Sequence, residues 1–376
     1  MADVFIAGAG MTKIGRRSEP LPDLMAEAAH AALAEAGLDV PEAIVVATMN
    51  PEEFLGDGNF ASNVATQMGF ADIPTLRVET ATSSGAAALY AAFAQVAAGL
   101  RASVLVVGGE KMTHLATPRV SEIIGRSIDP YERAYGATMP ALAGIVTRAL
   151  LTRGAITARE IAQVAVKNHA NGARNPLAHF QEPVTLQEVL ESRMVADPLR
   201  LLHCCPISDG AAAVVLTGDA RHVRVAGIGQ GTDTLAVRHR RDLTSFTATR
   251  MAAREAYGMA RFGPARVDVA EVHDAFAPFE LISLEDLGLF PPGKAGRATL
   301  DGDTAVDGRL PINTSGGLKA RGHPLAGTGI AQIVECVWQL TGRAHGRQVP
   351  HATRALAHSI GGLATNNWVT LLEARS

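Results

Sequence analysis

The chain has 376 residues, of which 47% are hydrophobic and 19% are charged, so it can bury a large core in one large domain or in two fused halves. A formal net charge of −3 gives no electrostatic basis for binding nucleic acid or an anionic membrane. Low aromatic content (5%) combined with 37 glycines is typical of an α/β enzyme and not of a sandwich or barrel of short strands.

The first half predicts alternating strands and helices. Buried strands are expected at 4–7, 43–47, 75–79 and 104–108, and helices rich in small residues at 24–37 and 83–99. From about residue 112 to residue 207 the alternation stops, prolines become frequent, and two helices are expected at 139–154 and 157–171. We interpret this stretch as an excursion that lies over one face of the sheet.

The second half repeats the theme after a strand at 211–216. Strands are expected at 223–228, 267–272, 355–360 and 368–372, and helices at 246–257 and 327–342. Short β-rich runs separated by helices favour a mostly parallel sheet that is covered on both faces. The correspondence of the two halves indicates an internal duplication, with an N-terminal half at 1–219 and a C-terminal half at 220–376.

The three cysteines indicate a reduced, intracellular compartment. Cys204 and Cys205 are neighbours that cannot easily bridge, Cys336 falls inside a helical run, and no C-x-x-C pair points to zinc. We interpret all three thiols as small buried hydrophobes and expect no metal site. With no apolar run of the ~18 residues that a membrane span needs, a soluble cytoplasmic protein is expected.

A glycine pair after the first strand raises the question of a dinucleotide site. Gly8-Ala9-Gly10 is followed by Lys13 where the third glycine of the fingerprint should stand, and no acidic residue ends a second strand at the right distance. We therefore interpret these glycines as turn residues.

Two histidine motifs of the second half carry the strongest chemical signal. His273-Asp274 follows a buried strand, and the carboxyl ends of such strands are where open α/β sheets bind ligands. His323 stands between Gly322 and Pro324, directly before a helix whose N-terminus can stabilise negative charge. Together these two rings predict an acid/base and oxyanion-stabilising pair.

These motifs resemble those of the thiolase superfamily, especially sterol-carrier-type thiolases and acetyl-CoA acetyltransferases. The matches run in order along nearly the whole chain and include 78–85, 106–112, 165–169, 192–198, 205–212, 273–276, 313–317 and 322–324. The resemblance implies an α/β thiolase-like fold of two repeated βαβαβαββ halves with an inserted loop domain. It also implies an acyl-CoA substrate, coenzyme A as substrate or product with no covalently bound cofactor, and a homodimer.

The resemblance also assigns roles. His323 would activate the nucleophile, His273 would position water or complete the oxyanion hole, and the nucleophile itself would lie at Thr82. Asn313, Gly362 and His169 are expected to contact the substrate. Lys13, Lys167, Lys319 and Arg321 are candidates for contacts with the coenzyme A phosphates.

The expected catalytic cysteines are replaced. Threonine holds the nucleophile position, and an alcohol ionises far less readily than a thiol while its β-methyl crowds the approach. Ala275 stands where sterol-carrier-type relatives have a cysteine between aspartate and phenylalanine, and His358-Ser359-Ile360-Gly361-Gly362 replaces the C-terminal C-x-G turn.

Three hypotheses about function remain open. One is a thiolase-like enzyme that makes or breaks a C–C bond beside a CoA thioester without an acyl-enzyme, for example by retro-aldol chemistry. The second is an acyltransferase that uses Thr82, and the third is a non-catalytic subunit that retains the fold for a partner. Some relatives work with a small OB-fold protein that carries a zinc ribbon, so the resemblance implies a partner of that kind as well.

Overall fold

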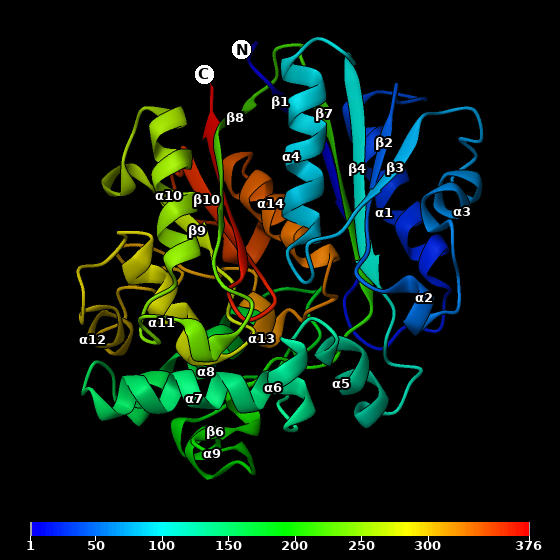
Figure 1. Ribbon diagram of the computed structural model, residues 1–376. Coiled ribbons are helices and arrows are strands. Elements are labelled where there is room, and N and C mark those ends of the chain that lie inside the picture. The colour runs from blue at the N-terminus through cyan, green and yellow to red at the C-terminus, as the bar shows by residue number, and fades with distance from the viewer. Residues whose placement is uncertain (1, 376) are drawn as a thin grey trace.

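A computed structural model describes residues 2–375 and shows one nine-stranded sheet with helices on its faces (Figure 1). The strand order is β3-β2-β4-β7-β1-β8-β11-β10-β9. The first-half strands are β1 (Phe5–Met11), β2 (Ile44–Ala47), β3 (Thr75–Val78), β4 (Ser103–Glu110) and β7 (Gly210–Thr217). The second-half strands are β8 (Val223–Thr232), β9 (Val269–Glu271), β10 (Arg354–Gly361) and β11 (Asn366–Ala374).

The sheet is mixed, so the prediction of a mostly parallel sheet is wrong. Neighbouring strands are parallel in the pairs β2/β3, β2/β4 and β9/β10, and antiparallel in the other five pairs. The strands β7 and β11, which end the two halves, each lie antiparallel between two neighbours. The burial of these strands on both faces produces the same continuous apolar runs that a parallel sheet has, and sequence pattern therefore cannot distinguish the two.

Two apolar helices, α4 (Ser84–Ala97) and α14 (Gly327–Leu340), form the centre of the molecule. They pack against each other, and α14 contacts strands of both halves of the sheet (Figure 1). The helices α1 (Leu21–Ala36) and α10 (Thr247–Ala260) cover the first-half and second-half strands respectively. The nearly complete burial of α14 explains why its sequence is apolar around most of its circumference.

The glycines that follow the first β-run belong to the strand and not to a turn, which corrects the sequence interpretation. A Cβ atom at Gly8 would lie 2.0 Å from the carbonyl oxygen of Ala32 in α1. The equivalent strand of the second half shows the same device, because a Cβ atom at Gly229 would lie 2.2 Å from the carbonyl oxygen of Ala252 in α10. These glycines allow helix and strand backbones to touch.

The excursion contains five helices and a small hairpin below the sheet in the view of Figure 1. Its elements are α5 (Thr117–Gly125), α6 (Pro130–Ala134), α7 (Met139–Thr152), α8 (Ala158–Gly172), α9 (Leu186–Glu191), β5 (Met194–Ala196) and β6 (Leu199–Arg200). Beside it lie the short helices α11 (Ala277–Asp286), α12 (Ala295–Leu300) and α13 (Gly317–Ala320). The helix α3 (Phe60–Gln67) packs on β2 and β3, and α2 (Pro51–Phe54) contacts α5. Within residues 2–375, no helix is long and apolar enough to cross a membrane.

Candidate active site

A cavity of about 210 Å³ lies between the excursion and the ends of the sheet. Its lining includes three residues that the sequence proposed as catalytic, namely Thr82, His273 and His323, together with Gly362. The remaining wall is mostly apolar and includes parts of α5, the start of α7 and the segments 204–207 and 275–279. Residues that are far apart in the sequence therefore converge on one apolar cavity with a few polar groups, as is usual for a small-molecule site.

His273 follows β9 and is held by the neighbouring strand. The Ile360 N–H donates to the His273 Nδ1 atom at 3.2 Å, so Nδ1 is the acceptor and the proton of the neutral ring is on Nε2. Burial lowers the pKa of His273 well below its ordinary value, and repulsion from His323 and His358 in their protonated forms acts in the same direction. His273 is therefore a neutral imidazole whose Nε2–H can donate a hydrogen bond.

His323 is placed by an unusual backbone. Gly322 has a φ of +108°, and a Cβ atom there would lie 2.6 Å from the Ile14 side chain and 2.8 Å from the Ser208 hydroxyl, so a larger residue does not fit. The His323 backbone N–H donates to the Ser208 Oγ atom at 3.3 Å, and its Nδ1 atom lies 2.7 Å from the Thr328 Oγ1 atom in α14.

The two imidazoles lie edge to face. Their ring centroids are 5.1 Å apart, with an interplanar angle of 87°. Burial and the Arg321 guanidinium lower the pKa of His323 to about 3. Both rings are thus neutral, which allows them to lie side by side without the repulsion of two imidazolium charges.

Thr82 precedes α4 in a turn that begins with Ala81, a non-glycine residue at a φ of +55°. Its Oγ1 atom donates to the Ile360 carbonyl oxygen at 2.7 Å. The hydroxyl proton is therefore directed at a backbone carbonyl, and not at either imidazole. Ile360 thus contacts two of the three residues, because its N–H binds His273 and its carbonyl binds Thr82.

A buried network fixes the loop that follows His273. The Asp274 carboxylate accepts from the Leu318 and Lys319 backbone N–H groups at 2.6 and 3.2 Å, and from the Asn168 side chain at 2.6 Å. The Asn168 amide also donates to Glu280, which pairs with the Lys167 ammonium at 2.9 Å. Because the partners come from three different elements, the network ties the excursion to the second half of the sheet.

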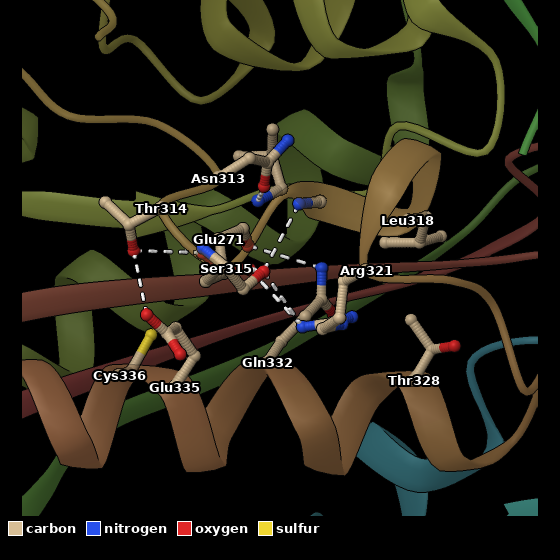
Figure 2. A network of polar contacts seen from close by, with 12 residues as sticks. Glu271, Asn313, Thr314, Ser315, Leu318, Arg321, Thr328, Gln332, Glu335 and Cys336 are labelled. Atoms are coloured by element: carbon tan, nitrogen blue, oxygen red, sulfur yellow. Dashed lines mark hydrogen bonds and ion pairs between the residues drawn. The ribbon is translucent and has the colours of Figure 1, made fainter. Parts of the chain in front are cut away.

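A second network fixes the loop that precedes His323 (Figure 2). Glu271, the last residue of β9, accepts from the Ser315 backbone N–H at 3.0 Å and from its hydroxyl at 2.5 Å, and pairs with Arg321 at 3.4 Å. Figure 2 shows Thr314 between Glu271 and Glu335, and Glu335 in turn pairs with Arg347 at 2.8 Å. The strand before His273 and the loop before His323 are therefore held by the same carboxylate.

Two further side chains line the cavity that the sequence did not propose for the site. Cys204 and Cys205 face it, although sequence pattern suggested buried structural thiols. Their segment bridges both histidine loops, since Cys204 pairs with Phe276 and Ile207 pairs with His323. Burial raises the pKa of the Cys204 thiol to about 11 and that of the Cys205 thiol to about 12. Both are therefore protonated at neutral pH.

Other proposed contacts lie outside the lining. Asn313 is buried and bonded internally, because its Oδ1 atom accepts from the Val272 N–H at 2.8 Å and its amide donates to Glu280 at 2.7 Å. His169 stacks on Phe180 with ring centroids 5.4 Å apart. The structure therefore places neither Asn313 nor His169 against the cavity.

Three of the four cations considered for the coenzyme A phosphates are also buried. Lys167 and Arg321 form the internal ion pairs described above, and Lys319 is 1% exposed. Their burial contradicts that expectation, and Lys13 alone of the four is exposed.

Comparison with known proteins places the chain in a family. Residues 4–220 match the thiolase N-terminal domain, and residues 229–374 match the C-terminal domain-like model of thiolases. An acetyl-CoA acetyltransferase of Methanothermobacter thermautotrophicus is 42% identical over 372 residues, covering 96% of this chain and 97% of that protein. Sterol carrier protein 2 of Bos taurus is 34% identical, covering 95% of this chain and 70% of that protein.

Among solved structures, the Ltp2-ChsH2(DUF35) aldolase superposes with a TM-score of 0.84 at 25% identity, covering 99% of this chain and 98% of that one. The family models together span nearly the whole length, and the thiolase-like α/β fold expected from the sequence is confirmed. This chain therefore belongs to the thiolase superfamily and is an enzyme of that superfamily.

Proposed function

We propose that this enzyme breaks or makes a C–C bond beside a coenzyme A thioester without forming an acyl-enzyme, by retro-aldol chemistry on a 3-hydroxyacyl-CoA. The observation that carries this proposal is the arrangement of Thr82, His273 and His323 around one cavity, with the Thr82 hydroxyl bonded to the Ile360 carbonyl. A hydroxyl in that position lacks the general base that would make it a nucleophile.

The two neutral histidines supply what a retro-aldol step needs. His273 would donate its Nε2–H to the thioester oxygen, where negative charge develops as the enolate forms. His323 would accept the proton of the substrate 3-hydroxyl group, with its Nδ1–H donating to Thr328. Gly362 at the cavity wall would leave room for the acyl chain.

The cavity thiols do not support the alternative of covalent acyl transfer. Cysteine attacks as a thiolate, and burial raises the pKa of both Cys204 and Cys205 to 11 or above. An acyltransferase that uses Thr82 remains the second candidate, because the resemblance to thiolases assigns the nucleophile to that position. A non-catalytic subunit would need no such pair of buried imidazoles.

We also propose a homodimer and a second protein as partner. The aldolase that superposes on this chain carries the names of two components, Ltp2 and ChsH2(DUF35). This supports the expectation, drawn from the resemblance, of a small OB-fold protein with a zinc ribbon. The cytoplasmic location is likewise part of the proposal.

Product analysis tests the proposed reaction. The purified chain is incubated with 3-hydroxyacyl-CoAs of varied chain length, and in parallel with 3-ketoacyl-CoAs plus free coenzyme A, and products are identified by mass spectrometry. An aldehyde or ketone released with a shortened acyl-CoA, and no adduct on the protein, is the expected result. Thiolysis products with an acyl group on Thr82 would overturn it in favour of the acyltransferase.

A further inference from the structure

Cleavage of the C–C bond leaves an enolate whose α-carbon must receive a proton, and neither histidine is placed in the proposed step to give it. His273 holds the thioester oxygen, and His323 takes the proton from the substrate hydroxyl. The Thr82 hydroxyl donates to Ile360. The cavity contains other polar hydrogens at Thr117 and Ser121 and at the two thiols. A thiol is a much stronger acid than an alcohol, which makes the thiols the better proton donors.

The backbone places Cys205 between the two histidine loops. The Cys205 N–H donates to the Ala275 carbonyl oxygen at 2.9 Å, two residues beyond His273. Two residues further along the same segment, Ile207 pairs with His323. Cys205 is thereby anchored to the loop of one histidine and adjacent to the anchor of the other, and its side chain lines the cavity that both rings share.

The two thiols differ in their partners. The Cys204 Sγ–H donates to the Arg200 carbonyl oxygen at 3.5 Å, whereas the Cys205 Sγ–H has no hydrogen-bond acceptor within the described residues. The Cys205 proton is therefore free to move to a bound molecule. The side chain of Lys319 is also buried, at 1% exposure, and its Nζ atom lies 5.4 Å from the centroid of the Phe180 ring.

The Lys319 ammonium can stabilise a thiolate that exists transiently. Its charge acts on both thiols and favours their ionised form, opposing the larger effect of burial. No carboxylate pairs with the Lys319 side chain among the ion pairs of residues 2–375, although its backbone N–H binds Asp274. Burial also lowers the pKa of Lys319, and while this side chain carries its charge it lowers the energy of the thiolate that proton donation creates.

We propose that Cys205 is a further catalytic residue: its thiol protonates the α-carbon of the acyl-CoA enolate. This inference rests on the proposed function. In the forward step the substrate O–H proton passes to the His323 Nε2 atom, the bond between C2 and C3 breaks, and a C3 carbonyl and a thioester enolate form. The S–H bond of Cys205 then breaks as a C2–H bond forms. The thiolate finally recovers a proton from the His323 imidazolium, so protons and electrons balance without an external oxidant or reductant.

Exchange of α-hydrogens measures this step alone. The full-length protein is incubated in D2O with acetyl-CoA, propionyl-CoA and longer straight-chain acyl-CoAs, and deuterium at C2 is followed by mass spectrometry. Acid–base catalysis by one side chain is worth at least about 100-fold, so Cys205→Ala is expected to slow exchange by that factor. Binding of the acyl-CoA, measured separately by calorimetry, should change by less than about threefold.

Two controls make the outcome decisive. Cys336→Ala removes a buried thiol of α14 that lies outside the cavity lining, and it is expected to lose no more than about threefold in exchange. Thermal unfolding verifies that both variants fold. Exchange that survives Cys205→Ala in a folded protein overturns the role of Cys205 while leaving the proposed function intact. If the wild-type chain exchanges no α-deuterium and cleaves no 3-hydroxyacyl-CoA, the proposed function and this inference both fail.

Discussion

Replacing Thr82 by cysteine tests whether this one side chain blocks covalent chemistry. The change removes a methyl group, worth about 1 kcal/mol when buried, and weakens the 2.7 Å hydrogen bond to the Ile360 carbonyl, worth about 1 kcal/mol. Thr82→Cys should therefore destabilise the fold by about 2 kcal/mol and remain folded. The new thiol would stand directly before the N-terminus of α4, which favours the thiolate and opposes the burial that raises the pKa of Cys204 and Cys205.

The expected result is an acyl adduct that the natural protein does not form. After incubation with acetyl-CoA, intact-protein mass spectrometry should show one acetyl group on Thr82→Cys, located by peptide mapping at the introduced thiol. Thr82→Ser is the matched control, because it removes the same methyl group but keeps a hydroxyl, and it should remain unmodified. A folded Thr82→Cys protein without adduct would refute the reasoning, as would an adduct on Thr82 in the natural chain.

Three further predictions concern buried ionisable side chains. Because His323 is neutral with a pKa near 3, activity is lost only as pH falls toward that value, so the acid limb of a kcat/KM profile should lie below about pH 5 and not near 6.5. Burial raises the pKa of Asp209, but hydrogen bonds from Thr113 lower it by more, so the stability that this carboxylate contributes is present above pH ~4 and lost on acidification. In thermal melts, Asp209→Asn should lose this pH dependence, and its free energy of unfolding at pH 7 should fall by about 3 kcal/mol. Lys167→Met leaves the Glu280 carboxylate buried without its cation, and the free energy of unfolding in urea should fall by about 3–5 kcal/mol. The control Arg148→Met removes an exposed ion pair and should lower it by less than about 1 kcal/mol.

Local pattern predicted the elements of the fold better than their connections. The apolar runs at 104–108 and 355–360 became β4 and β10 because a buried strand needs little more than β-branched residues and turns at its ends. The direction of β7 was not predictable, since it depends on where the long excursion returns the chain. The pair Gly8 and Gly10 was misread because a strand glycine facing a helix carries no local mark that distinguishes it from a turn glycine.

The candidate site was predictable where each residue carries its own motif. His273 and His323 adjoin a strand end and a helix start, and these features are visible in sequence. Cys205 was missed because its cavity position depends on pairing with Ala275, far along the chain. Asn313 was expected at the substrate, but its unusual backbone (φ of +56°) and its bonds to Val272 and Glu280 make it a structural support behind the cavity.

The backbone contacts at Gly8 and Gly229 have a consequence for how this fold can diverge. Where a strand touches a helix directly, the spacing of the two elements is set by main-chain van der Waals radii, whatever the volume of the side chains elsewhere. Substitutions in the surrounding core can therefore accumulate without altering the separation of α1 from β1 or of α10 from β8. Side chains in the loops, including thiols, hydroxyls and imidazoles, can therefore be replaced while the strand and helix ends that carry these loops keep the same separation.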